Sequence, residues 1–104
     1  MANSKAYTVV VNGAENCSVS GAGNYIAGNE YNVTITPNTG YAMSSVYGYG
    51  NLVNSSIITV NGAQMYSGIT VKGTSNTPGS TVTITVSGVS RYYKFYFANT
   101  SGRV

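Results

Sequence analysis

The chain has 104 residues, and 42% of them are hydrophobic, which is enough for one globular domain with its own core. It contains no histidine, one cysteine (Cys17) and two acidic residues (Glu15 and Glu30), so an internal disulfide is excluded and a zinc or calcium site has almost no ligands available. Only 7% of residues are charged, with a net charge of +3 from basic residues that are scattered rather than clustered. We therefore expect no cofactor, no metal, no nucleic-acid partner and no membrane association.

The first part of the chain predicts a strand followed by a tight turn. Residues 1–6 are polar and aperiodic, and we expect a loose lead-in before a single β domain over 7–98 and a tail over 99–104. Apolar residues alternate from Tyr7 to Val11, and Asn12-Gly13 follows. Asn-Gly after an extended segment predicts a two-residue type I′ hairpin, because both central residues need positive φ. The return strand would then run over residues 14–20.

The clearest strand lies in the middle of the first half. Tyr31, Val33 and Ile35 alternate with polar residues, which places three apolar side chains on one face of an extended strand. The segment 37–40, Pro-Asn-Thr-Gly, supplies turn chemistry and predicts that the chain returns from Tyr41 as a second hairpin strand.

The second half predicts further strands. Asn61-Gly62 separates segments 55–60 and 63–66 and predicts another hairpin, and the string Val-Asn-Gly-Ala occurs at both 11–14 and 60–63, as an internal repeat would produce. Residues 68–73 form another short strand, 74–80 a loop, and 81–86 a strand with perfect alternation. Segment 91–98 carries aromatic residues on both faces, so we expect another sheet, a ligand or a subunit to cover its outer face. The sum is an all-β fold, a β-sandwich or small barrel of about eight to ten short antiparallel strands.

Several of these segments resemble one known family. The start Tyr-Thr-Val-Val-Val at 7–11, the signature Thr-Pro-Asn-Thr-Gly-Tyr at 36–41 and the closing Phe-Tyr-Phe at 95–97 are similar to the divergent InlB B-type (Listeria–Bacteroides) repeats and related bacterial surface modules. Where that family often has a Trp in a Gly-Trp pair, this chain has Ser-Ser-Val-Tyr at 44–47. The resemblance implies a non-enzymatic, β-rich module displayed on a cell or virion surface, with no catalytic residues.

The residues themselves offer little for catalysis and more for contact. Nothing in the spacing brings Glu15 and Glu30 together, and Cys17 has no histidine to activate it, so we expect no enzyme. Ten tyrosines are a large supply of rigid, amphipathic rings that can stack on sugars, bases or proteins. The candidate interface or ligand contacts are the loop tyrosines and the outer face of segment 91–98: Tyr47, Tyr49, Tyr66, Tyr92, Lys94 and Tyr96.

Low charge and β-rich composition favour a structural or adhesion module, such as a phage capsid decoration or a tail-fibre-type domain, that associates with itself or with other virion or surface proteins. The first five residues lack a hydrophobic secretory segment, and a short reading frame that begins with Met fits a virion protein best, so we expect a virion or an extracellular surface location. Two alternatives stay open: a carbohydrate-binding module that uses the loop tyrosines, with glycans as partners, and a small intracellular inhibitor of a host protein.

Overall fold

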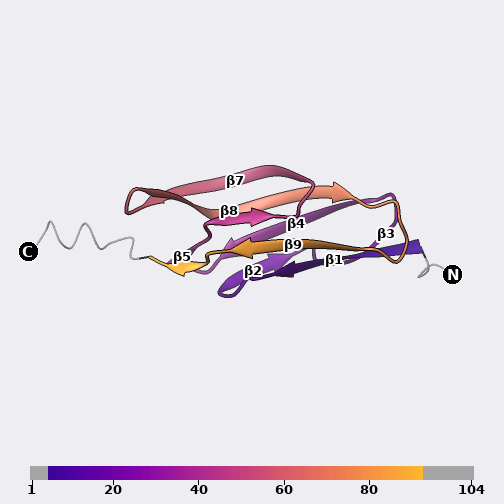
Figure 1. The fold of residues 1–104 in the computed structure, drawn as a ribbon, viewed down its shortest axis with the longest axis horizontal. Coiled ribbons are helices and arrows are strands. Elements are labelled where there is room, and N and C mark those ends of the chain that lie inside the picture. The colour runs from indigo at the N-terminus through magenta and orange to yellow at the C-terminus, as the bar shows by residue number, and fades with distance from the viewer. Residues whose placement is uncertain (1–4, 93–104) are drawn as a thin grey trace, which may run out of the picture.

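The computed structural model describes residues 5–92, and these residues form ten β-strands in an elongated body (Figure 1). In chain order the strands are β1 (Ala6–Asn12), β2 (Cys17–Ser20), β3 (Gly23–Ile26), β4 (Glu30–Pro37), β5 (Tyr41–Ala42), β6 (Ser45–Tyr47), β7 (Asn51–Val60), β8 (Ala63–Thr74), β9 (Thr81–Ser87) and β10 (Ser90–Arg91). The first and last of these strands lie at opposite ends of the long axis.

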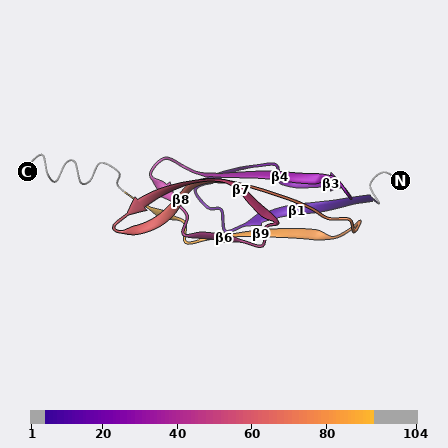
Figure 2. The ribbon, with the colours of Figure 1, turned by 90° about the horizontal axis from the view of Figure 1, so that it is seen from above.

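Two four-stranded sheets pack face to face, and this arrangement confirms the predicted all-β sandwich. One sheet has the strand order β3-β1-β9-β6 and the other β2-β4-β8-β7, while β10 and β5 form a separate two-stranded pair. The two layers are visible from above, where β6 and β9 lie below β4 (Figure 2). Neither four-stranded order closes on itself, so the described residues form a sandwich rather than a barrel.

The strands are not all antiparallel as predicted, because β1 and β9 pair in parallel. Their register runs from Thr8 opposite Thr81 to Asn12 opposite Thr85. The chain enters both strands from the same end of the sandwich, since the loop before β9 returns it to the place where β1 begins. The Thr8 N–H donates to the Ser80 carbonyl there (3.0 Å).

The core lies between the two sheets and is made by the period-two pattern of the strands. Tyr31, Val33 and Ile35 of β4 are all buried, as their alternation predicts. They lie beside buried residues of β8 in the same sheet and pack against buried residues of β1 and β9 in the other sheet and of the connection after β5. The rest of the buried core cluster consists of Tyr7, Val9, Met43, Ile69, Val71, Ile84 and Val86.

The hairpin predicted at Asn12-Gly13 is wrong, because β1 and β2 belong to different sheets. Gly13 has a φ of 80° and Asn16 a φ of 58°, so the chain does turn here, but it crosses from one sheet to the other. A Cβ on Gly13 would collide with the Val86 carbonyl of β9. The segment that connects β1 to β2 therefore packs tightly against the end of β9.

The hairpin predicted after β4 is also wrong, although its turn forms. The Tyr41 N–H donates to the Asn38 carbonyl (2.9 Å), and Gly40 has a φ of 88°. The strand that follows, β5, pairs with β10 instead of returning along β4. Both sides of β4 are already occupied by β2 and β8, so no edge is available for a returning strand.

The Asn61-Gly62 hairpin is confirmed. Both residues have positive φ (53° and 84°), as a type I′ turn requires, and Val60 lies directly opposite Ala63. The flanking strands are longer than predicted, since β7 has ten residues and β8 has twelve and joins the predicted segments 63–66 and 68–73. The predicted strand over 81–86 is confirmed as β9, whereas most of the predicted strand over 91–98 and the tail over 99–104 lie outside the described residues.

Candidate interaction surface

Three tyrosines from both sheets form a structural cluster. Tyr7 and Tyr25 stack with ring centroids 5.7 Å apart, and Tyr31 lies edge-on to both at 6.4 Å. Each hydroxyl has a backbone partner: Tyr7 donates to the Asn29 carbonyl (2.5 Å), Tyr25 donates to the Gly21 carbonyl (2.6 Å) and Tyr31 accepts from the Gly50 N–H (3.0 Å). These rings contact one another across the two sheets and tie the sheets together.

The environment of the Tyr7 hydroxyl favours its neutral form. Loss of hydration raises the pKa of the Tyr7 phenol above its ordinary value, and the neighbouring Tyr25 adds to the effect. A neutral phenol can donate its proton to the Asn29 carbonyl, which an ionised one could not. Both the hydrogen bond and the raised pKa therefore indicate that the neutral phenol of Tyr7 is the stabilised form.

Cys17 is a half-buried residue of β2, as predicted. Burial, and then the nearby Glu15 carboxylate, raise the pKa of its thiol, and the sulfur lies 3.4 Å from the Glu15 carbonyl. A thiol with a raised pKa is protonated at neutral pH and is a poor nucleophile. This environment gives Cys17 a packing role.

The structure does not gather the predicted contact residues into one site. Tyr47 of β6 is 55% exposed, but Tyr49 and Tyr66 are half-buried and pack against the core. Tyr92 is half-buried, and its N–H donates to the Gly40 carbonyl (2.7 Å). The other two predicted contact residues, Lys94 and Tyr96, lie outside the described residues. A contact role for this set stays a prediction.

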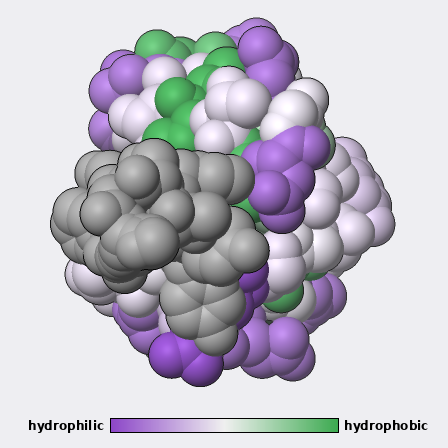
Figure 3. Space-filling view, turned by 90° about the vertical axis from the view of Figure 1, so that its left-hand side faces the viewer, coloured by the Kyte–Doolittle hydropathy of each residue, from purple (hydrophilic) through white to green (hydrophobic). Residues whose placement is uncertain are grey.

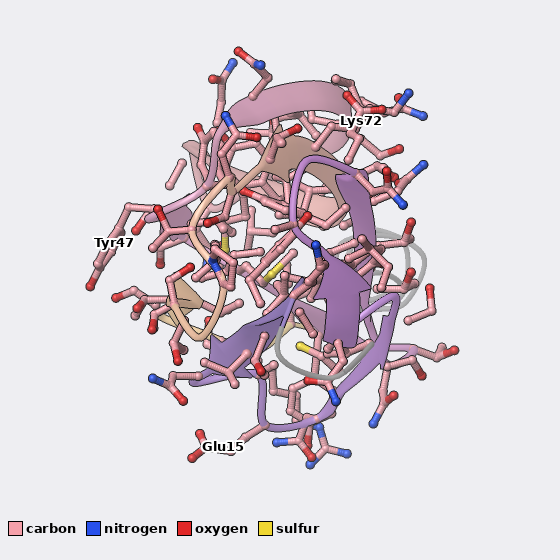
Figure 4. All side chains as sticks on the ribbon, turned by 90° about the vertical axis from the view of Figure 1, so that its right-hand side faces the viewer. Glu15, Tyr47 and Lys72 are labelled. Atoms are coloured by element: carbon pink, nitrogen blue, oxygen red, sulfur yellow. The ribbon has the colours of Figure 1, made fainter. Side chains whose placement is uncertain are left out.

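The charged residues are likewise dispersed. Lys72 forms an exposed ion pair with Glu30 (3.9 Å), while Glu15 lies on the crossing between β1 and β2. Figure 4 shows Glu15, Lys72 and Tyr47 pointing outward from three separate parts of the molecule. Within residues 5–92, no group of three or more His, Cys, Asp or Glu side chains could hold a metal ion. The same residues contain no helix that is long and apolar enough to cross a membrane.

The most distinctive surface feature is the edge strand β7, which the sequence analysis did not single out. The other three edges of the two large sheets are β2, β3 and β6, which have four, four and three residues, whereas β7 has ten. Its sequence, NLVNSSIITV, contains no charged residue and no proline, and its one extra residue relative to β8 is Val53, near its beginning. Edge strands of monomeric proteins are normally short or protected by charge, proline or bulges. In Figure 1, β7 forms the outer border of its sheet, and none of the other strands within residues 5–92 lies beyond it.

Two large apolar side chains are exposed along this edge. Val53 is 49% exposed and Ile57 is 52% exposed. Hydrophobic residues also lie among neutral and polar ones in the upper part of the end-on view, where Figure 1 places β7 and β8 (Figure 3). The whole of residues 31–71 is uncharged, so absence of charge alone could not have revealed this surface; the distinguishing feature is the ten-residue length of the strand before the Asn61-Gly62 turn, because a strand of that length at a sheet edge exposes many unpaired backbone groups.

Comparison with known families gives one result. A family model described as the divergent InlB B-repeat domain matches residues 7–64, which is more than half of the chain and extends from β1 to the beginning of β8. A search of curated proteins and a search of solved structures found no match. The matched segment includes the Thr-Pro-Asn-Thr-Gly-Tyr signature at 36–41, so the resemblance noted in the sequence is confirmed. The chain belongs to the family of divergent InlB B-repeat domains.

Proposed function

We propose that this domain is a non-enzymatic module, displayed on a bacterial cell or a virion, that works through self-association and contact with neighbouring surfaces. The observation that carries the proposal is the long, uncharged edge strand β7 with its two exposed apolar side chains. Membership of the InlB B-repeat family supports a modular surface role. The low charge of the chain supports it too, because few charges means weak repulsion between copies.

The measurement that tests this proposal is absolute mass by light scattering after gel filtration, over a wide range of protein concentration. We expect the average mass to rise above that of one chain as concentration increases. Surface display is tested separately by antibody labelling of intact cells or purified particles that carry the protein. A constant monomer mass at every concentration would refute self-association, and absence from intact surfaces would refute display.

Carbohydrate binding through Tyr47 is a second candidate, because this ring is more than half exposed and a free aromatic face can stack on a sugar. Glycan-array binding should then be lost in Tyr47→Ala. The matched variant Tyr49→Ala should instead lower stability, because Tyr49 packs against the core. An array with no specific signal would remove this candidate.

A further inference from the structure

The regular part of β7 is a seven-residue strand with a defined centre. A register shift between Leu52 and Asn54 makes Val53 an extra residue, so regular pairing in β7 begins at Asn54. The second register shift adds a residue to β8 and leaves β7 continuous up to the turn after Val60. The segment 54–60 is therefore an uninterrupted edge, and its middle residue is Ile57.

We propose that two copies of the domain pair antiparallel along segment 54–60 of β7, about a two-fold axis at Ile57. This inference rests on the proposed self-association and names the surface that mediates it. The pairing would join the two β2-β4-β8-β7 sheets into one continuous eight-stranded sheet, with backbone hydrogen bonds supplied by groups that β7 leaves unpaired at its outer edge.

The side chains on one face of the sheet are self-complementary in this register. Ile57 lies opposite Ile57 of the second copy at the axis, so the most exposed large aliphatic side chain on β7 is covered by its own equivalent. On either side, Ser55 lies opposite Thr59, which pairs two hydroxyl side chains. These pairs share one face of the sheet, whereas on the other face Ser56 lies opposite Ile58 and Asn54 lies opposite Val60.

The distribution of charge favours a second copy as the occupant. Both copies carry the same charges, so a self-interface must avoid placing charged residues opposite themselves. Segment 54–60 contains no charged residue. On the neighbouring strand β8, the only charged residue paired with β7 is Lys72, which lies opposite Asn51 and therefore outside the segment. Two positively charged molecules can therefore meet at this edge without direct repulsion.

The first test introduces a charge at the proposed axis. Ile57→Lys places two ammonium groups opposite one another and should raise the dissociation constant for self-association roughly tenfold or more, since like charges directly opposite are unfavourable and the apolar pair is lost. The matched control is Ile26→Lys, which makes the same change at a 48% exposed isoleucine on β3, an edge of the other sheet. This control should associate like the unmodified protein. Circular dichroism establishes that both variants are folded.

The second test uses disulfide formation in a Cys17→Ser background. Residues directly opposite in antiparallel strands have Cα atoms about 4.5–5.5 Å apart, which suits a disulfide. Ile57→Cys should therefore cross-link two chains under mild oxidation. In Ser55→Cys the two thiols are offset by four residues, about 13 Å along the strand, and should not cross-link.

The outcomes separate this inference from the proposed function. Loss of association in Ile57→Lys but not in Ile26→Lys, with cross-linking at position 57 alone, supports the β7 interface. Unchanged association in Ile57→Lys overturns the β7 interface and leaves self-association standing. Equal cross-linking at positions 55 and 57 overturns the axis at Ile57. A monomer at every concentration overturns both the interface and the self-association on which it rests.

Discussion

Gly73 offers the sharpest test of how the two sheets are locked together. It lies on β8 directly opposite Tyr31 of β4, and its missing side chain leaves room for the tyrosine ring. A Cβ added at Gly73 would lie 2.6 Å from Tyr31 Cζ and 2.8 Å from Cε2, distances that force the ring to move. Tyr31 is only 2% exposed, so the ring is enclosed by protein and cannot simply shift toward solvent. Gly73→Ala should therefore disrupt the tyrosine cluster.

The expected cost follows from three contributions. Forcing an extra methyl group into a packed core costs about 1–3 kcal/mol. Moving the ring also breaks the hydrogen bond from the Gly50 N–H to the Tyr31 hydroxyl, worth about 0.5–1.5 kcal/mol. Replacing glycine restricts the unfolded chain and returns about 0.4–1 kcal/mol. Gly73→Ala should thus lower the free energy of unfolding by about 2 kcal/mol.

The matched control for Gly73→Ala is Gly68→Ala on the same strand. A Cβ there meets no atom within 4 Å, so we expect a small stabilisation of about 0.4–1 kcal/mol from the unfolded state alone. Urea unfolding followed by far-ultraviolet circular dichroism, at one protein concentration, measures both variants. In a Tyr31→Leu background, which removes the ring, Gly73→Ala should cost much less. Equal stability of the two alanine variants, or an unchanged cost in Tyr31→Leu, would refute the argument.

Three further predictions concern the turns, the tyrosine cluster and the core. Gly13→Ala and Gly62→Ala both place alanine at a φ near +80° after an asparagine. Only at position 13 would the added Cβ collide with a backbone carbonyl of β9, so Gly13→Ala should lower the free energy of unfolding in urea more than Gly62→Ala. Equal costs would contradict the close packing of that crossing. Tyr7→Phe should cost about 1 kcal/mol at neutral pH. Because burial raises the pKa of Tyr7, the folded state binds more protons than the unfolded state above about pH 10, so the stability of the wild type falls as pH rises past that value. The difference in free energy of unfolding between wild type and Tyr7→Phe should therefore narrow at high pH. A difference that is constant with pH would contradict this. Ile84→Ala removes a fully buried side chain and should cost about 2–5 kcal/mol, whereas Ile57→Ala at the exposed edge should cost less than about 1 kcal/mol when the protein is monomeric. Thermal midpoints that fall equally for both would contradict the assigned core.

The sequence alone was sufficient for the strands with clear alternation, β4 and β9, and for their buried faces. Alternation over Tyr31, Val33 and Ile35 predicted their burial, because side chains of a strand point to opposite faces with a period of two and only one face of β4 meets the opposing sheet. The same reasoning holds for β9. The family signature at 36–41 also depends only on local residues, and the family match confirmed it.

Which strands pair was decided by the tertiary structure. The string Val-Asn-Gly-Ala occurs twice, yet at 60–63 it closes the β7–β8 hairpin and at 11–14 it carries the chain from one sheet to the other. Asn-Gly fixes a local turn with positive φ, but it does not determine which strand lies beyond the turn. The two neighbours of β1 in its sheet are β3 and β9, so no edge of β1 is left for the strand that follows the Asn12-Gly13 turn.

The exposed edge of β7 was likewise decided by the tertiary structure. A run of uncharged residues becomes a long unpaired edge only if no other strand covers it, and that depends on the placement of every other strand in the sheet. The tyrosines show the converse: of those predicted as contacts, Tyr49 in the connection between β6 and β7 and Tyr66 on β8 pack against the core. Local sequence therefore determined the clearly alternating strands and their inner faces, whereas strand order, which is set by long-range burial, determined which residues meet solvent and partners.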